Sequence, residues 1–173
     1  MGYVGRLAPE KHVERLAALA GIDGVRLVVV GDGPARPRLE RLLPGATFLG
    51  MLTGAELAAA YATLDVFVHT GPFETFGQAV QEAMASGIPV VAPDAGGPRE
   101  LVQHGRTGYL VPPGAPDPLR DAVVRLRDDP VLRHTFGRAA RRAVRGRTWP
   151  VVCDELMLHY EAVAAPRPVP KVA

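Results

Sequence analysis

The sequence contains a single cysteine, Cys153, among its 173 residues, so it cannot form a disulfide within the chain. It also lacks any cluster of cysteine and histidine residues at the spacing that metal ligands require. There is no Asp-x-Asp pair that would hold a divalent metal. We therefore expect no bound metal and no cofactor, and we predict that Cys153 is a small residue of the core.

Long apolar runs and blocks of basic charge are missing as well. No apolar run reaches the roughly 18 residues that a membrane span needs, and the first residues do not have the pattern of a signal peptide. The formal net charge is only +2, and the arginines are spread through the chain, which argues against nucleic acid as a partner. These features predict a cytoplasmic protein.

The residues that are present suit one globular domain. The chain is 47% hydrophobic and 22% charged, and its length allows one good core. We expect this domain to span residues 1–163. Residues 164–173 are rich in proline and are predicted to form a disordered tail.

Short apolar runs alternate with helical patterns along the domain. Unbroken apolar runs are typical of buried parallel strands, and their alternation with helices predicts an α/β fold: a Rossmann-like open parallel sheet with helices on both faces. The predicted strands are residues 2–5, 25–30, 46–49, 65–69, 88–92 and 107–111. The predicted helices are residues 11–20, 35–43, 54–63, 77–87, 96–101, two segments after residue 116 that are divided near residues 130 and 146, and residues 149–163.

The loops at one edge of this sheet carry an unusual set of residues. In open parallel sheets, ligands bind outside the carboxyl ends of the strands, where the strand order changes direction. The loops at that edge carry the cations Arg6 and Lys11 and the carboxylate Glu74. They also contain the glycines Gly31, Gly33, Gly50, Gly77, Gly96 and Gly97. The combination predicts a ligand that bears phosphate, although tight turns alone would explain some of these glycines.

The segment GPFETFGQAVQEAMASG, residues 71–87, is the most informative part of this edge. Good helix formers predict a helix between Gly77 and Gly87. Glu74 then lies in the loop before the helix, and Glu82 projects from the helix. The free backbone N–H groups at the helix start favour an anionic or oxygen-rich ligand. Spacing alone favours a simpler interpretation, in which Glu74 is a capping or loop charge and Glu82 is a solvated helix residue.

Several segments together resemble the carboxyl-terminal domain of the retaining family 4 glycosyltransferases, which have the GT-B fold. They are VGRLAPEK, VVVGDGP, residues 74–82, SGIPVVAPDAGGPRELV and GRTGYLVPPG, in the same order and spacing as in the family. The resemblance covers the chain from Tyr3 to about Tyr160. The motifs are most similar to those of bacterial α-mannosyltransferases that use GDP-mannose to build glycolipids. The resemblance thus implies a nucleoside-diphosphate sugar as donor and a lipid-linked acceptor.

The resemblance also implies which residues carry the chemistry. Arg6 and Lys11 match the basic pair that grips the donor diphosphate, where two cations suit a leaving group that gains negative charge. Glu74 matches the carboxylate that hydrogen-bonds the hydroxyls of the donor sugar, assisted by the backbone N–H groups of Phe76 and Gly77. In such enzymes the departing phosphate assists on the same face of the sugar, so no enzymic nucleophile is expected.

The remaining matches concern the nucleoside. Glu82 matches the carboxylate that accepts hydrogen bonds from the two ribose hydroxyls. Gly31 and Gly33 match loop residues that let the backbone approach the nucleotide, although a tight turn would also explain them. Leu52 aligns with the position whose backbone meets the base. Residues 50–54 contain no acidic residue that would bond a guanine edge, so the prediction of GDP rests on overall similarity.

GT-B enzymes close two domains over donor and acceptor, and this sequence starts at the first strand of the second domain. The resemblance implies that the amino-terminal acceptor domain, with the family's general acid or base, is a missing partner. The last helix would cross back to that domain, so Trp149 and the apolar face of this helix would be exposed without it. We expect the chain to bind donor but to turn over little or nothing. A lipid acceptor would place the full-length protein at the cytoplasmic face of the membrane.

Other functions fit the sequence less well. One alternative is a nucleotide-sugar-binding scaffold that has lost its chemistry, but the presence of Arg6, Lys11, Glu74 and Glu82 argues against it. A nucleotide-sugar epimerase would need additional acidic groups that the sequence does not show. An NAD-dependent oxidoreductase is disfavoured because no Gly-x-Gly-x-x-Gly follows the first strand. His69, at the end of a predicted strand, is expected to be a packed or loop residue.

Overall fold

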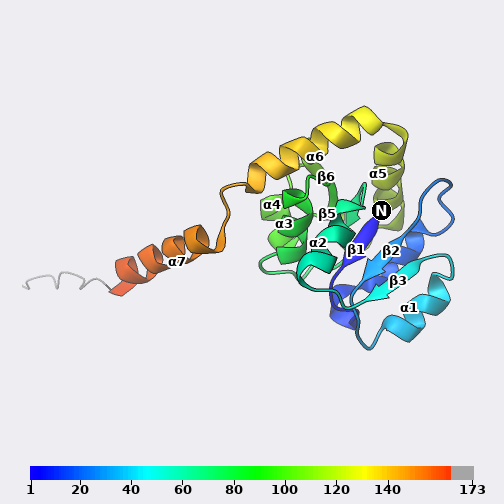
Figure 1. The fold of residues 1–173 in the computed structure, drawn as a ribbon, viewed down its shortest axis with the longest axis horizontal. Coiled ribbons are helices and arrows are strands. Elements are labelled where there is room, and N and C mark those ends of the chain that lie inside the picture. Colours follow the sequence, from blue (N-terminus) through cyan, green and yellow to red (C-terminus); the bar gives the residue numbers. More distant parts are fainter. Residues whose placement is uncertain (165–173) are drawn as a thin grey trace, which may run out of the picture.

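The computed structural model describes residues 1–164. Its centre is a six-stranded sheet in the order β3-β2-β1-β4-β5-β6, in which all neighbouring strands are parallel (Figure 1). The strands are β1 (Gly2–Val4), β2 (Val28–Val30), β3 (Thr47–Gly50), β4 (Phe67–Val68), β5 (Val90–Pro93) and β6 (Gly108–Val111). The predicted Rossmann-like fold class is therefore confirmed, and each strand lies at a predicted position.

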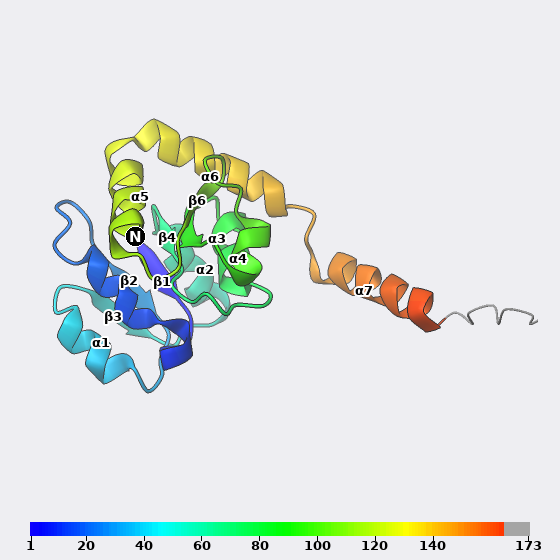
Figure 2. The ribbon, with the colours of Figure 1, turned by 180° about the vertical axis from the view of Figure 1, so that it is seen from behind.

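Helices cover both faces of the sheet, as Figures 1 and 2 show from opposite sides. They are the 3₁₀ segments η1 (Pro9–Lys11) and η2 (Val13–Leu19) and the α-helices α1 (Arg36–Leu42), α2 (Gly54–Ala62), α3 (Gln78–Ala85), α4 (Gly96–Leu101), α5 (Pro116–Asp128), α6 (Pro130–Val144) and α7 (Trp149–Ala164). None of the helices in residues 1–164 has the length and apolar character needed to cross a bilayer.

Successive residues of the inner strands point to opposite faces of the sheet, and both faces are buried there. Tyr3 and Val29 belong to one apolar cluster, which also holds residues of η2, α1 and α5. Val4 and Val30 belong to a second cluster with residues of α2, α3, α4 and α6. A strand that is covered on both faces needs apolar residues at every position, which explains the continuous apolar runs in the sequence.

The first predicted helix, residues 11–20, is wrong in form. Two 3₁₀ segments replace it, and they are separated by His12, which has left-handed backbone angles (φ 50°, ψ 39°). The hydroxyl of Thr70 donates to the carbonyl of Lys11 at 2.8 Å, while the backbone N–H of Arg15 donates to the carbonyl of His12 at 3.0 Å. Because Thr70 takes the carbonyl of Lys11, the chain turns more tightly than an α-helix at this point.

Helix α7 extends away from the sheet and has no buried residue (Figure 1). Trp149 and Tyr160 are 60% and 61% exposed, which confirms the predicted exposure of this helix. Cys153 also lies exposed on α7, so its predicted place in the core is wrong, because the helix that carries it does not pack on the core. Ala164 belongs to α7 rather than to the predicted tail, and residues 165–173 of that tail lie outside the described residues.

Candidate functional site

The strand order reverses between β1 and β4. From β1 the chain builds outward through β2 and β3, and it then continues on the other side of β1 with β4. The loops after two such strands diverge, which leaves a crevice at their carboxyl ends. The loop after β1 carries Arg6 and leads to Lys11, and the loop after β4 carries Glu74. The predicted phosphate-binding and sugar-binding residues therefore come from the two sides of this crevice.

Lys11 and Glu74 join the two loops. Nζ of Lys11 donates to Oε2 of Glu74 at 2.7 Å, and the two side chains are 26% and 20% exposed. Burial pushes the pKa of Glu74 upward, but the hydrogen bond and charge of Lys11, with a smaller effect of His69, leave this pKa below its ordinary value. Glu74 is therefore ionised at neutral pH and can accept hydrogen bonds from the hydroxyls of a ligand.

Two glycines fix the loop of Glu74 against the start of α4. A Cβ on Gly96 would lie 2.5 Å from the carbonyl oxygen of Glu74, and a Cβ on Gly97 would lie 2.6 Å from that of Thr75. The N–H of Gly97 also donates to the carbonyl of Glu74 at 2.6 Å. Only glycine allows this close approach of two backbones, so the loop is held in place without a ligand.

A pocket of about 520 Å³ opens between the loops that follow β1, β2 and β3. Four predicted site residues, Arg6, Gly31, Gly33 and Leu52, line it. Gly31 has a φ of +126°, and a Cβ at this position would overlap the carbonyl of Gly5. The remaining lining is mostly apolar, which together with exposed backbone suits the flat face of a nucleobase.

The two predicted diphosphate-binding cations lie at the same edge but have different partners. The guanidinium of Arg6 pairs with Glu10 and is 64% exposed. Exposed pairs of this spacing contribute little to stability, so Arg6 is free to meet an anionic ligand at the pocket mouth. Lys11 is tied to Glu74 instead. Within residues 1–164, the histidine, cysteine and acidic side chains form no group of three that could hold a metal ion.

Glu82 projects from α3 and lies outside the pocket that Arg6 lines. Its Oε2 accepts a hydrogen bond from the hydroxyl of Tyr61 at 3.0 Å, and its Oε1 accepts one from Nε2 of Gln78 at 3.0 Å. With Phe76 it lines a second pocket of about 170 Å³. Burial, and then the charge of Glu82, raise the pKa of Tyr61, so its hydroxyl remains a donor. No local sequence signal marks Tyr61, because its role depends on its contacts with Ala79 and Glu82 of α3.

His69, at the end of β4, is confirmed as a packed residue. It is 4% exposed, and neither ring nitrogen has a hydrogen-bond partner among the described residues. Burial lowers the pKa of His69 to about 4, although the nearby charge of Glu74 acts in the opposite direction. The imidazole is therefore neutral at neutral pH. Its ring lies next to Gly71, in the loop that leads to Glu74.

Replacing Lys11 with methionine is expected to lower the free energy of unfolding by about 1–2 kcal/mol, because the largely buried carboxylate of Glu74 loses its partner. Urea denaturation at pH 7 measures the effect. Arg99→Met is the matched control, since it breaks an ion pair with Asp94 in which both side chains are exposed, and it is expected to cost less than about 0.5 kcal/mol. Equal losses in the two variants would contradict the structural role of the Lys11–Glu74 pair.

Comparison with known proteins identifies the family. The family model described as "Glycosyl transferases group 1" matches residues 1–129. The chain belongs to the group 1 glycosyl transferases. A GDP-mannose-dependent alpha-mannosyltransferase of Mycolicibacterium smegmatis is 61% identical to this glycosyl transferase over 168 residues, which are 96% of the chain and 44% of the relative. One from Corynebacterium glutamicum is 47% identical over 167 residues, or 95% of the chain and 40% of the relative. The chain thus spans less than half the length of these relatives.

Solved structures show the same fold. Sucrose-phosphate synthase from Thermosynechococcus elongatus matches this glycosyl transferase with a TM-score of 0.84 at 31% identity, over 95% of the chain and 45% of that protein. Anabaena HepE, solved in complex with UDP, matches with a TM-score of 0.80 at 27% identity, over 93% of the chain and 48% of HepE. The sheet is therefore the carboxyl-terminal Rossmann-like half of a GT-B fold.

Proposed function

We propose that this chain is the donor-binding half of a retaining alpha-mannosyltransferase that uses GDP-mannose. The observation that carries the proposal is the convergence of Arg6, Gly31, Gly33 and Leu52 on one pocket at the carboxyl ends of β1, β2 and β3. The Lys11–Glu74 ion pair, which joins the loops after β1 and β4 across the reversal of strand order, supports it. The choice of donor follows the names of relatives that are 61% and 47% identical to this chain.

In this proposal the nucleobase enters the pocket between the loops after β1, β2 and β3, and the diphosphate crosses the crevice between Arg6 and Lys11. An ammonium group has three donors, so Lys11 can bind a phosphate oxygen while it keeps its bond to Glu74. Glu74 accepts hydrogen bonds from the sugar hydroxyls. Glu82, which Tyr61 and Gln78 orient, accepts the ribose hydroxyls.

The transfer itself needs no nucleophile from this chain. The bond between the anomeric carbon and the diphosphate oxygen breaks, and a bond to the acceptor oxygen forms on the same face, so the anomeric configuration is retained. The proton of the acceptor hydroxyl passes to the departing phosphate. Arg6, Lys11 and the N–H groups at the start of α3 stabilise the negative charge that gathers on the diphosphate.

The acceptor side is proposed to belong to another domain. The relatives are more than twice as long as the stretch that this chain matches, which leaves room for an acceptor domain. A lipid-linked acceptor is supported by a relative named phosphatidyl-myo-inositol mannosyltransferase, which is 38% identical over 172 residues. We accordingly expect the chain alone to bind donor and to turn over little or nothing, and the full-length enzyme to work at the cytoplasmic face of the membrane.

Calorimetric titration of the chain with GDP, UDP and ADP in the presence of EDTA tests this function. We expect GDP to bind more tightly than UDP or ADP, and binding to persist without a divalent metal. Binding of none of the three nucleotides would contradict the proposal. A preference for UDP would keep the donor-binding role and overturn the choice of donor.

Replacing Glu82 with alanine is expected to weaken GDP binding by about tenfold or more, because a carboxylate that accepts hydrogen bonds from two hydroxyls is lost. Calorimetry with GDP and with 2′-deoxy-GDP checks the assignment. The deoxynucleotide should bind less tightly than GDP to the wild-type chain, and it should lose less affinity than GDP in the variant. Glu40→Ala, on the exposed surface of α1, is the control and should bind GDP as the wild type does. Equal losses of affinity for GDP and 2′-deoxy-GDP would contradict the assignment of Glu82 to the ribose hydroxyls.

A further inference from the structure

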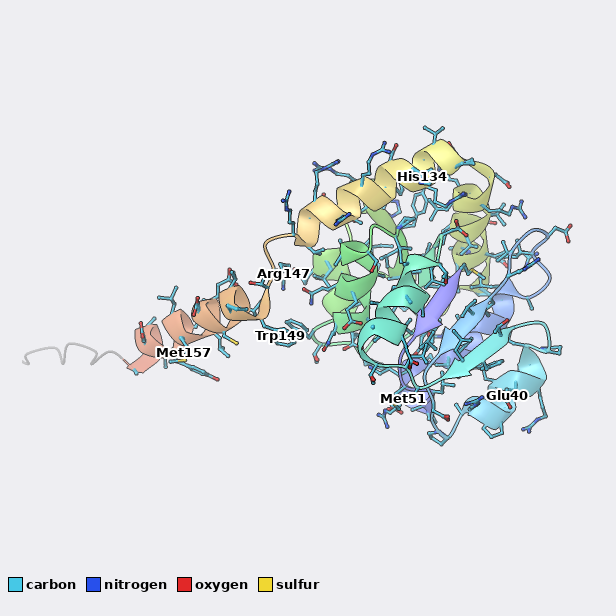
Figure 3. All side chains as sticks on the ribbon, in the orientation of Figure 1. Glu40, Met51, His134, Arg147, Trp149 and Met157 are labelled. Atoms are coloured by element: carbon cyan, nitrogen blue, oxygen red, sulfur yellow. The ribbon has the colours of Figure 1, made fainter. Side chains whose placement is uncertain are left out.

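The junction of α6 and α7, residues 145–149, is connected to Phe76 directly through Trp149 and indirectly through Arg147. The ring of Trp149 stacks on the ring of Phe76, with centroids 5.4 Å apart and 15° between the planes. Nε of Arg147 donates to Oε1 of Gln81 at 3.0 Å, and Nε2 of Gln81 donates to the carbonyl of Phe76 at 3.3 Å. Figure 3 shows Arg147 and Trp149 at the junction of α7 with the rest of the chain. Both the ring and the backbone of Phe76 are thus connected to this junction.

These contacts do not belong to the core of the domain. Trp149 is 60% exposed, and α7 has no buried residue. Its ring instead forms a wall of the 170 Å³ pocket that Glu82 also lines. A stacked pair of aromatic rings adds a preferred geometry to simple burial, so the stack fixes how the ring of Phe76 lies.

Phe76 occupies a sensitive position in the candidate site. It lies between Glu74, which pairs with Lys11, and Gly77, which precedes the first turn of α3 with a φ of +71°. A rotation of the Phe76 peptide would redirect the N–H groups of Phe76 and Gly77. Those are the groups assigned to the donor sugar, so a contact that fixes Phe76 also fixes their direction.

We propose that Trp149, supported by Arg147, is a positioning residue for the donor sugar and couples the donor loop to α7. The proposal rests on the proposed function and extends it. Ordering of the Phe76 loop by the sugar strengthens the stack, and by thermodynamic reciprocity anything that steadies α7 raises the affinity for the sugar. The exposed side chains of Leu156 and Tyr160 form a surface of α7, and a contact made on that surface would therefore act on the donor site through Trp149.

The test compares GDP-mannose with GDP on the 173-residue chain. Trp149→Ala is expected to raise the Kd of GDP-mannose by about 3- to 10-fold, the range expected for loss of one aromatic pair, and to raise the Kd of GDP by less than about twofold. Trp149→Phe, which can still stack, should restore the affinity for GDP-mannose. Leu158→Ala is the control, because Leu158 is a comparably exposed apolar residue of α7 (64%), and this variant should leave both Kd values unchanged.

Trp149 is the only tryptophan of the chain, so its fluorescence reports the stack directly. GDP-mannose should change the emission more than GDP does. An unchanged ratio of the two Kd values in Trp149→Ala, or a failure of Trp149→Phe to restore it, would overturn the positioning role. A wild-type chain that bound neither ligand would overturn the proposed function as well, so the two failures are distinguishable.

Discussion

Replacing Gly31 with alanine is expected to lower the free energy of unfolding by about 3 kcal/mol or more and to abolish nucleotide binding. The new Cβ would overlap the carbonyl of Gly5, and the φ of +126° at Gly31 is itself unfavourable for alanine. The carbonyl of Gly5 has little freedom to move away, because the N–H of Gly5 is bonded to the carbonyl of Val30 at 3.0 Å. The N–H of Gly31 donates in turn to the carbonyl of Gly50 at 2.7 Å. The substitution therefore disturbs the loops after three adjacent strands.

Urea denaturation and calorimetry with GDP measure these two effects. Gly45→Ala is the control, because a Cβ at Gly45 would meet nothing within 4 Å, and it should change stability by less than about 0.5 kcal/mol. If Gly31→Ala unfolded at the wild-type urea concentration, the close approach of the Gly31 and Gly5 backbones would be contradicted. Wild-type stability together with lost GDP binding would assign Gly31 to the ligand alone.

Acidification from pH 7 to pH 4 is expected to remove about 3 kcal/mol of stability through His69. Burial lowers the pKa of His69 from 6.5 in the unfolded chain to about 4 in the folded one. Between these values the unfolded chain binds a proton that the folded chain does not. Stability is therefore complete above pH 6.5, falls as the pH falls, and stops falling on this account near pH 4.

Other charged groups around His69 contribute to the pH dependence of stability at the acid end of this range. Glu74 and Lys11 lie near its ring, and Glu14 and Arg15 line the pocket of about 250 Å³ into which it faces. The pKa of Glu74 is below its ordinary value of 4.5, so the stability that Glu74 supplies is present above pH 4.5 and lost below it. The slope between pH 6.5 and 5 thus belongs to His69 rather than to Glu74.

Urea denaturation at pH 7, 6 and 5 measures this pH dependence, and the free energy of unfolding should fall by about 2 kcal/mol between pH 7 and pH 5. Phenylalanine and glutamine cannot take up the proton, so His69→Phe and His69→Gln should each lose most of this pH dependence. His134→Phe, at an exposed histidine of α6 that Figure 3 labels, should keep the wild-type slope. A slope that persists in both His69 variants would show that another group is responsible.

The sheet was predictable because its signals are local. Continuous apolar runs such as the one in β2 mark strands that are buried on both faces, and glycine or proline ends most of the helices. The errors arose where distant contacts decide the outcome. The bond from Thr70 to the carbonyl of Lys11 joins residues 59 positions apart, and it breaks the first helix. Cys153 lies on a helix whose pattern resembles that of a packed one but which has no buried residue.

The candidate site was predictable as a set of residues but not as an arrangement. The motifs placed Arg6, Lys11 and Glu74 at one edge of the sheet, and the structure brings Lys11 and Glu74 into contact. Spacing did not show that Arg6 pairs with Glu10, or that Glu82 lies in a different pocket from Arg6. Those facts depend on side-chain directions that tertiary packing sets.

The pocket between the loops after β1, β2 and β3 is walled largely by main chain. Glycines form much of its β1 and β2 sides, and the valines there are buried in the core. The exposed side chains on those two sides are the charged Arg6 and Asp32. The stretch after β3 differs, because Met51 and Leu52 line the pocket and Met51, labelled in Figure 3, is 70% exposed. Under the proposed function, the apolar positions to vary for a different nucleotide base are therefore few, and they lie in the loop after β3.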